Sequence, residues 1–280
     1  MKSYLKRGIK YILKGPEVIH HKPQLNVNIV YTTPSQLLAG KKILITGGNK
    51  GIGFALSKKF IAEGADIVIV GRDERSLISV SKCLKCKYIC ADIQETENLE
   101  NIVLEANEML NGMNCLVNNA GVSLHEGNIC NVSEQQFDIQ YKTNLKAAFF
   151  LSQHFIKIVE ESGTKESNIL FVSSERGTYV DDLPYGITKN AVNCLVKGLA
   201  RRVITRGMRV NAVAPGITAT SLTGYNEDDN LYLESGMSKR VYLPDEVAEI
   251  GCFLLSDVSK CLNGQILTCD EGRSINVYWR

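Results

Sequence analysis

The chain has 280 residues, of which 44% are hydrophobic and 22% are charged, and its formal net charge is +2. This composition is typical of a folded domain, and the near-neutral charge gives no indication of nucleic acid as a partner. No apolar run reaches the length of a membrane span, and no apolar signal-peptide segment follows the basic start. We therefore expect a cytoplasmic protein with reduced cysteines.

The start of the chain differs in composition from the rest. Residues 1–14 combine apolar and basic side chains at helical spacing and predict a short basic amphipathic helix, and residues 20–36 look extended. Such a start could contact an anionic membrane surface or form an arm that packs on the protein or on a neighbouring subunit. We favour the packed arm because residues 25–31 alternate in polarity as a strand does. The sequence thus predicts an N-terminal extension over residues 1–37 and one domain over residues 38–280.

From residue 41 onward, short apolar strands alternate with helices. The pattern predicts strands at 42–46, 66–70, 87–91, 114–118, 168–173, 208–213 and near 264–268, with helices at 51–64, 73–82, 95–110, 134–160, 183–206 and 244–255. Residues 214–242 follow neither pattern and are predicted to be irregular. Strands that alternate with helices form a parallel sheet covered on both faces, so we expect an α/β, doubly wound, Rossmann-type fold.

The turn between the first strand and the first helix is rich in glycine. Backbone free of side chains can approach a ligand closely, and a helix N-terminus offers N–H groups and a positive dipole end to a pyrophosphate. A glycine-rich turn without a ligand is the alternative, but the position directly after the first strand favours dinucleotide binding. The expected cofactor contacts in this turn are Gly47, Asn49, Lys50, Gly51, Ile52 and Gly53.

The end of the second strand bears on the choice between NAD and NADP. Enzymes that prefer NAD place an acidic residue there, which binds the ribose 2′-hydroxyl, whereas this chain has Gly71 and Arg72. A guanidinium can instead pair with a 2′-phosphate, and Lys50 could approach the same group. Unless both side chains are only solvated surface charges, the sequence predicts NADP(H), with NAD(H) less favoured.

Tyr185 and Lys189 are spaced so that they share one face of a predicted helix. A free phenol has a pKa of about 10, and a nearby ammonium favours the phenolate. Such a tyrosine could exchange a proton near neutral pH. The pair by itself is a weak signal, because the chain has 11 tyrosines.

Cys83, Cys86 and Cys90 lie close together in sequence and could suggest a metal site. A zinc site would need a second pair of ligands at similar spacing, and no histidine clusters with these cysteines in the sequence. We expect no metal, and interpret these cysteines as small apolar residues in and before a strand.

Several motifs occur together in one order. They are the glycine turn, Asn118-Asn119-Ala120-Gly121, Asn144, Ser174, Tyr185 with Lys189, and Pro215-Gly216. In this order the chain resembles the short-chain dehydrogenase/reductase family from about Leu38 to Gly272. The resemblance implies an NADP(H)-dependent oxidoreductase that transfers hydride between nicotinamide and a carbonyl or secondary alcohol of a small molecule.

The resemblance also implies roles for four catalytic residues. Tyr185 would exchange a proton with the substrate oxygen, and Lys189 would lower the pKa of Tyr185 and hold the nicotinamide ribose. Ser174 would donate a hydrogen bond to the substrate oxygen, and Asn144 would hold a water in a proton relay. The interval from Ser174 to Tyr185 is shorter than is common in the family, which leaves open whether Ser173 or Ser174 faces the substrate. We choose Ser174.

Further residues are expected around the cofactor from the same resemblance. Asp92, with Ile93 beside it, would contact the adenine. The loop residues Asn119, Ala120 and Gly121 would lie beside the cofactor. The nicotinamide pocket would be shaped by Pro215, Gly216 and Ile217, with Thr218 bonding the carboxamide.

Other points of the sequence concern partners and alternatives. The resemblance implies a homodimer or homotetramer formed through helices 134–160 and 183–206. The irregular segment carries Glu227, Asp228, Asp229 and Glu234, which argues against a polyanionic substrate. Two other functions are weighed: a non-catalytic dinucleotide-binding sensor or scaffold, and an epimerase or dehydratase of nucleotide sugars. The first would lack a catalytic residue, and the second would carry a longer C-terminal part.

Overall fold

The computed structural model describes residues 35–225 and 229–275. Within them, seven strands form a single sheet in the order β3-β2-β1-β4-β5-β6-β7, and all neighbouring strands are parallel. The chain runs from the middle of the sheet to one edge, returns, and then continues to the other edge. This is the doubly wound fold that the sequence predicts. The predicted N-terminal helix and most of the predicted arm lie outside the described residues.

Each predicted strand is present. β5 is buried along its whole length and β1 along most of it, which explains their apolar sequences, since parallel strands are covered on both faces. The strands are β1 (Lys42–Thr46), β2 (Asp66–Gly71), β3 (Lys87–Cys90), β4 (Cys115–Asn118), β5 (Ser167–Val172), β6 (Met208–Pro215) and β7 (Ile266–Cys269).

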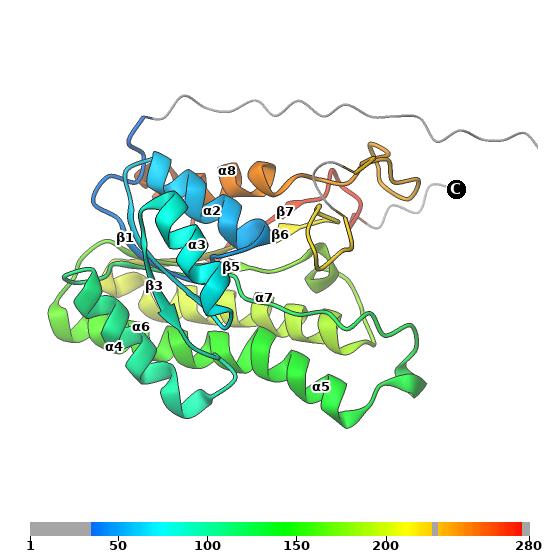
Figure 1. Ribbon diagram of the computed structural model, residues 1–280, viewed down its shortest axis with the longest axis horizontal. Coiled ribbons are helices and arrows are strands. Elements are labelled where there is room, and N and C mark those ends of the chain that lie inside the picture. The colour runs from blue at the N-terminus through cyan, green and yellow to red at the C-terminus, as the bar shows by residue number, and fades with distance from the viewer. Residues whose placement is uncertain (1–34, 226–228, 276–280) are drawn as a thin grey trace, which may run out of the picture.

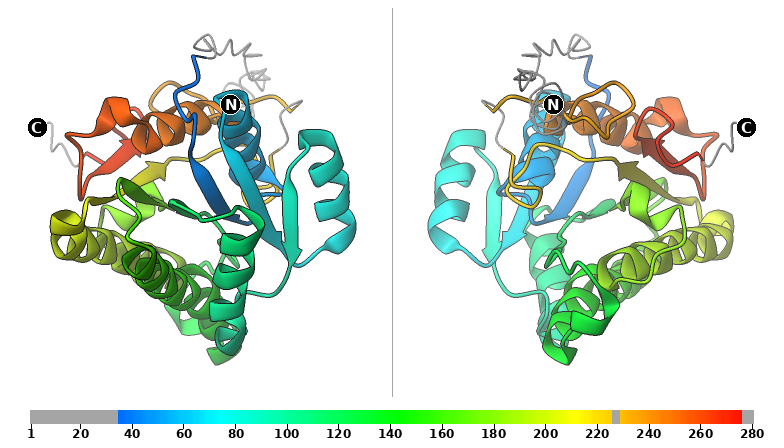
Figure 2. Two further views of the ribbon diagram at one scale, coloured as in Figure 1. Left: turned by 90° about the vertical axis from the view of Figure 1, so that its left-hand side faces the viewer. Right: turned by 90° about the vertical axis from the view of Figure 1, so that its right-hand side faces the viewer.

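Helices cover both faces of the sheet (Figure 1). One layer contains α2 (Gly51–Ala62), α3 (Glu74–Leu84) and α8 (Pro244–Leu255). The other contains α4 (Leu99–Met109), α5 (Glu134–Tyr141), α6 (Ala147–Ser162) and α7 (Pro184–Val203). The two side views in Figure 2 show the sheet between these layers.

The two layers bury separate apolar clusters against the sheet. Leu56 and Phe60 of α2 pack with Val247 of α8 on one face. Phe155 of α6 and Val196 of α7 pack on the other. Burying a large apolar side chain stabilises a fold by about 1.5–3 kcal/mol, so these two clusters hold the sheet and its loops in place. In the described part of the chain, no helix is both long and apolar enough to cross a membrane.

The segment 134–160, predicted as one helix, is interrupted. A π-helical turn, η3 (Lys142–Lys146), separates α5 from α6. The buried side chain of Asn144 lies in this turn and bonds the backbone of Val122, accepting from its N–H at 2.8 Å and donating to its carbonyl at 2.9 Å. Contact with a distant loop therefore accompanies the change in helical geometry, and hydrophobic periodicity alone does not reveal it.

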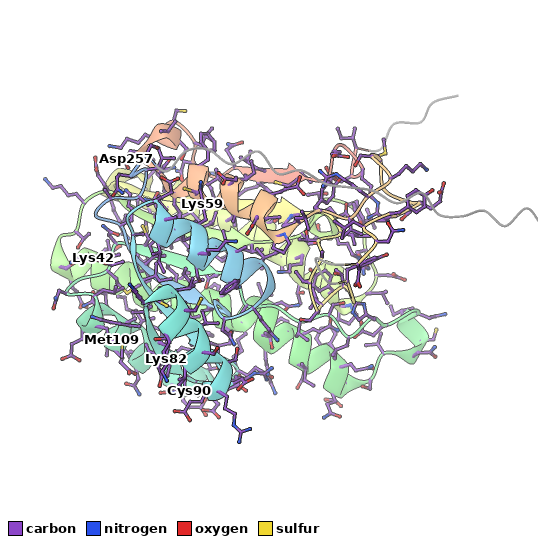
Figure 3. All side chains as sticks on the ribbon, turned by 45° about the horizontal axis from the view of Figure 1, so that its top comes forward. Lys42, Lys59, Lys82, Cys90, Met109 and Asp257 are labelled. Atoms are coloured by element: carbon purple, nitrogen blue, oxygen red, sulfur yellow. The ribbon has the colours of Figure 1, made fainter. Side chains whose placement is uncertain are left out.

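The start of the described chain is fixed to the end of α2. The buried carboxylate of Glu63 accepts hydrogen bonds from the backbone N–H of Ser35 at 3.0 Å and of Leu37 at 3.2 Å. Lys59 lies on α2 (Figure 3). Its ammonium pairs with Glu63 at the end of the same helix and with Glu249 of α8. Residues just before β1 are thus attached to the domain by a buried, charge-assisted contact.

Candidate active site

A cavity of about 720 Å³ lies at the carboxyl ends of the central strands. Here β1 is flanked by β2 and β4, so the strand order reverses, which is where ligands bind in open α/β sheets. Most of the site residues expected from the sequence line this cavity. They are Gly47, Asn49, Lys50, Gly51, Ile52, Gly53, Arg72, Asp92, Ile93, Asn119, Ala120, Gly121, Tyr185 and Lys189.

The glycine turn is compressed at one end of the cavity. A side chain on Gly53 would overlap the carbonyl oxygen of Gly47. Gly47 itself has a backbone φ of +64°. The Asn119 amide donates to the carbonyls of Thr46 at 2.8 Å and Gly47 at 3.1 Å, and so ties this turn to the end of β4. The turn therefore needs glycine both for its backbone conformation and for the close approach.

The N-termini of α2 and α3 differ in their caps. At α3, the Asp73 side chain accepts from the backbone N–H of Ser76 at 3.2 Å. At α2, no side chain caps the helix and no acidic residue lies in the first turn. Since the first N–H groups of a helix need acceptors, the α2 terminus fits the pyrophosphate of a dinucleotide.

The two cations expected at the 2′-position of the ribose both lie on the cavity wall. Arg72 is exposed, with a guanidinium nitrogen 3.4 Å from Asp92 Oδ2, and Lys50 is the first residue before α2. The Asn49 amide donates to Ser76 Oγ at 3.0 Å, which joins the glycine turn to α3. A phosphate at this end would meet two positive charges and a helix N-terminus.

The two serines at the end of β5 point in different directions. Ser173 Oγ donates to Asn193 Oδ1 at 2.6 Å, within the protein. Ser174 Oγ forms a hydrogen bond with the Tyr185 side chain and also accepts from the backbone N–H of Arg176 at 3.3 Å. Ser173 is part of the cavity wall and Ser174 is not. Ser174 is nevertheless the serine whose hydroxyl bonds Tyr185, and the two neighbouring side chains point in different directions as residues along an extended chain do.

Tyr185 and Lys189 lie together at the inner end of the cavity. Lys189 Nζ is 5.7 Å from the Tyr185 ring centroid and donates to the Val172 carbonyl at 2.8 Å. Burial lowers the pKa of Lys189 to about 8. Burial also raises the pKa of Tyr185, and the Ser174 hydrogen bond and the Arg176 charge only partly oppose it. The expected lowering of the Tyr185 pKa by Lys189 is therefore not seen here, because desolvation outweighs the nearby charges.

Asn144 lies behind the cavity wall, near Lys189. Its amide donates to Thr188 Oγ1 at 3.2 Å on α7, in addition to its bonds with Val122. A side chain on Gly121 would come within 3.5 Å of both Asn144 Oδ1 and Lys189 Nζ. The structure thus brings Asn144, Lys189 and Gly121 together, as the ordered motifs imply.

The residues at the end of β6 and just after it do not line this cavity. They are Pro215, the last residue of β6, and Gly216, Ile217 and Thr218, so their place around the nicotinamide stays a prediction. Thr218 is buried and its hydroxyl donates to the Gly216 carbonyl at 3.0 Å, so that its side chain is occupied within its own loop.

The next residues of the same loop do reach the cavity. Thr220, Ser221 and Leu222 line the cavity. A ring nitrogen of His125 lies 2.8 Å from the Leu222 carbonyl and joins this loop to the one that follows β4. No local pattern in the sequence indicates this contact, because its two residues are 97 positions apart.

The cysteines are free thiols. Cys83 and Cys90 are exposed, and Cys86 is half-buried. In residues 35–225 and 229–275, no three side chains of His, Cys, Asp or Glu gather in a way that could hold a metal ion. Of the acidic residues in the irregular segment, Glu227 and Asp228 lie outside the described residues.

A protein-family model described as enoyl-(acyl carrier protein) reductase matches residues 47–274, which is most of the chain. The chain belongs to the short-chain dehydrogenase/reductase family. The match spans the glycine turn, the cavity and Tyr185 with Lys189, so the family assignment and the geometry concern the same region.

Curated members of this family resemble the chain along most of their length. A 3alpha-hydroxysteroid dehydrogenase of Mediterraneibacter gnavus is 33% identical over 245 residues, covering 84% of this chain and 97% of the relative. NADPH-dependent aldehyde reductase 1, chloroplastic, of Arabidopsis thaliana is 32% identical over 260 residues, covering 87% and 89%. General stress protein 39 of Bacillus subtilis is 32% identical over 250 residues, covering 85% and 86%.

Solved structures of the family share the fold. A short-chain dehydrogenase from Burkholderia cenocepacia in complex with NADP has a TM-score of 0.77 and 28% identity, covering 84% of this chain and 98% of that one. A 3-ketoacyl-(acyl-carrier-protein) reductase from Brucella melitensis complexed with NADH has a TM-score of 0.78 and 30% identity, covering 85% and 100%. Nicotinamide dinucleotides are thus bound by structures that resemble this chain.

Proposed function

We propose that this member of the family is an NADP(H)-dependent oxidoreductase that transfers hydride between nicotinamide and a carbonyl or secondary alcohol of a small molecule. The observation that carries the proposal is that Tyr185 and Lys189 meet at one end of a cavity whose other end is lined by the glycine turn. Ser174 is not itself in the cavity wall, but its hydroxyl bonds the Tyr185 side chain. A non-catalytic sensor would not need a hydroxyl pair and a buried ammonium at this place.

The cofactor, when bound, supplies or accepts the hydride. Tyr185 holds the proton, and its raised pKa keeps the phenol protonated near neutral pH, which suits donation to a carbonyl oxygen. Ser174 hydrogen-bonds the Tyr185 side chain, and we expect it to donate to the same substrate oxygen. A positioned general acid accelerates a reaction by about 10²–10⁴-fold. Lys189 and Asn144 are proposed to hold the cofactor ribose and a relay water, respectively.

The preference for NADP(H) is proposed from Arg72 and Lys50. Both cations border the part of the cavity next to β2, where no acidic residue takes the ribose-binding place at the strand end. Arg72 lies only loosely on Asp92, so it is able to turn to a phosphate. One relative is named as NADPH-dependent, and one solved structure of the family holds NADP while another holds NADH.

A substrate screen tests the proposed function. The full chain would be mixed with NADPH or NADH and a panel of ketones and aldehydes, and with NADP⁺ and alcohols for the reverse direction, while cofactor absorbance is followed. We expect turnover with NADPH and little with NADH. Binding of NADPH without turnover of any compound would support the sensor or scaffold instead, and no binding of either dinucleotide would refute the proposal.

We further propose a homodimer or homotetramer. Large apolar side chains are exposed on the helices that were predicted to form the contact: Phe137 and Tyr141 of α5, Phe149 of α6 and Ile187 of α7. Exposed apolar surface of this kind marks interaction sites. Light scattering at micromolar concentration would give a multiple of the chain mass, and a monomer mass would contradict the proposal.

Two further predictions from the sequence concern the extension and the location. We propose that residues 1–37 form a packed arm, because Ser35 and Leu37 at its end already bind Glu63 of the domain. A chain that starts at Leu37 should then be less stable, as a thermal melt would show. The cytoplasmic location stays a prediction.

A further inference from the structure

The short segment between Ser174 and Tyr185 carries a buried ion pair next to the proposed catalytic tyrosine. It begins with a 3-10 helix, η4 (Glu175–Gly177), and ends where α7 begins at Pro184. The pair joins the Arg176 guanidinium to the Asp181 carboxylate, with both Nε (2.6 Å) and a terminal nitrogen (2.5 Å) on Oδ2. The Asp181 side chain is only 4% exposed and that of Arg176 is 33% exposed. Two charge-assisted hydrogen bonds to a buried carboxylate fix the orientation of the guanidinium, unlike a loose surface ion pair.

Asp181 is held by the first turn of α7. Its Oδ1 accepts from the backbone N–H of Leu183 at 3.0 Å, just before the helix. A side chain on Gly186 would overlap the Asp181 carboxylate, so the glycine after Tyr185 is what lets the carboxylate lie against the helix. The helix that carries Tyr185 therefore also fixes the position of Asp181, and through it Arg176.

As a result, Arg176 lies beside the Tyr185 ring and its backbone contacts the Ser174 hydroxyl. Its guanidinium carbon lies 5.8 Å from the centroid of the Tyr185 ring, close to the 5.7 Å of Lys189 Nζ. Its backbone N–H donates to Ser174 Oγ at 3.3 Å. A cation near a phenol stabilises the negative charge of the phenolate. It is also attracted to the electron-rich face of the ring.

We propose that Arg176 is a positioning residue for the reaction: its guanidinium, held by Asp181, stabilises Tyr185 in the anionic form that exists once the proton has moved to substrate, and its amide directs Ser174. The inference rests on the proposed function, because the proton transfer at Tyr185 belongs to that function. It adds a residue that the ordered motifs do not include.

The other charged groups around Tyr185 are accounted for by their own partners. The Lys189 ammonium bonds the Val172 carbonyl, and Glu175 pairs with Arg273 at 2.6 Å. Burial raises the pKa of Tyr185, and the Glu175 and Tyr179 side chains raise it further. The hydrogen bond from Ser174 and the charge of Arg176 lower the pKa of Tyr185. Arg176 is thus a charged group next to Tyr185 that works against the effect of burial. The polar and charged groups around Tyr185 are Ser174 after β5, Glu175 and Arg176 of η4, Tyr179 and Asp181 of the connecting segment, and Lys189 of α7.

The test measures the ionisation of Tyr185 in the full chain. Ultraviolet absorbance of phenolate would be titrated with and without NADP⁺, and the same titration of a chain that also carries Tyr185→Phe would be subtracted. Three variants are compared with wild type: Arg176→Met, which keeps the stem and removes the charge; Arg176→Lys, which keeps a charge; and Asp181→Asn, which removes the counter-charge. The matched control is Arg206→Met, since Arg206 pairs with Glu160 on the surface, away from the cavity.

We expect Arg176→Met to move the titration midpoint of Tyr185 upward by about half a pH unit or more. Arg176→Lys should stay near wild type, and Arg206→Met should leave the midpoint unchanged. Asp181→Asn should move the midpoint upward, because the guanidinium is no longer held beside Tyr185. The pH profile of alcohol oxidation, which needs the anion as base, should move in the same directions. A purely structural role would change stability without moving the midpoint.

The proposal is overturned if Arg176→Met leaves the midpoint in place, or if Arg176→Lys moves it as far as Arg176→Met does. Should Arg176→Met fail to fold, as circular dichroism would show, Asp181→Asn decides, and an unshifted or lowered midpoint overturns the proposal. A shifted midpoint without any turnover would refute the proposed function and leave only the effect of Arg176 on the ionisation of Tyr185 standing. Turnover together with an unmoved midpoint would support the proposed function and overturn the role of Arg176.

Discussion

The two ends of the cavity are built on opposite principles. At the phosphate end, the wall is backbone: Gly47 and Gly53 are in close contact, and the N-terminus of α2 has no side-chain cap. At the catalytic end, the wall is made of side chains withdrawn from solvent, among them Lys189, which is 4% exposed, and the half-buried Tyr185. One end works because side chains are missing and the other because they are present and buried.

This difference sets what each end tolerates. Adding atoms should damage the phosphate end, where a backbone oxygen occupies the space that a side chain would need. Removing atoms should damage the catalytic end, and there the loss should appear in turnover rather than in stability. A buried ammonium such as Lys189 is in fact unfavourable for folding, because burial penalises its charged form.

Removing one oxygen atom at the catalytic end should have the largest effect. In Tyr185→Phe, turnover should fall by about 10²–10⁴-fold, because the general acid is lost. The ring remains, so NADPH affinity and the melting temperature should stay near those of wild type. Steady-state kinetics and a fluorescence titration of NADPH would measure the two quantities separately. Near-normal turnover would contradict the assignment of Tyr185 as the general acid.

Adding one carbon atom at the phosphate end should weaken cofactor binding selectively. In Gly53→Ala, the new methyl group would overlap the Gly47 carbonyl, so the turn must shift, and NADPH affinity should fall by about tenfold or more, or at least 1.4 kcal/mol. Gly198→Ala on α7 is the matched control. No atom lies within 4 Å of its added carbon, and alanine favours a helix by about 1 kcal/mol. Calorimetry of both variants tests the contrast, which fails if they bind NADPH equally well.

Reversing one charge at the phosphate end should change the choice of cofactor. In Arg72→Asp, NADPH affinity should fall by about tenfold, because a charge-assisted contact is replaced by repulsion, while NADH affinity is kept or improved. Arg75→Asp is the control: Arg75 is exposed one helical turn away on α3 and does not line the cavity. The ratio of kcat/KM for the two cofactors is the measurement. Equal ratios in wild type and Arg72→Asp would remove the argument for NADP(H).

The smallest expected effect is on stability, and it depends on pH. The pKa of Lys189 is about 8 in the folded chain, below its ordinary value, so the unfolded chain binds more protons above pH 8. Stability contributed at this site therefore rises with pH from about 8 to about 10. Relative to Lys189→Met, the unfolding free energy of wild type should increase over this range by about 1 kcal/mol or more. Urea titrations at several pH values would show it, and a constant difference would contradict the buried ammonium.

The fold could be predicted because its cause is local and repeated. The strands β1, β2 and β5 are apolar runs between polar helices, and parallel strands buried on both faces leave that pattern in the sequence. The phosphate end could be predicted for the same reason, since Gly47, Gly51 and Gly53 follow one another in a single turn.

The catalytic end could be predicted only in part. Tyr185 and Lys189 share a helix face, so their spacing reveals them, but the choice between Ser173 and Ser174 depends on Asn193, which lies on another element. The contact of His125 with Leu222 and the place of Thr218 outside the cavity wall depend on loops that no periodicity describes. The balance between burial and charge at Tyr185 likewise needs three-dimensional distances, because desolvation has no sequence pattern.

The π-helical turn η3 has a consequence for comparing this chain with its relatives. A π turn contains one residue more than an α-helical turn, so it corresponds to a single inserted residue within an otherwise continuous helix. Because the wider turn absorbs the extra residue, deleting one residue between Lys142 and Lys146 would restore regular helix and leave α5 nearly in register with α6. A deletion would therefore remove the wide turn in which Asn144 lies, whereas a substitution would change a single side chain. An alignment of relatives without this turn therefore requires a one-residue gap beside Asn144, and a gap placed elsewhere would assign the wrong residue to its contact with Val122.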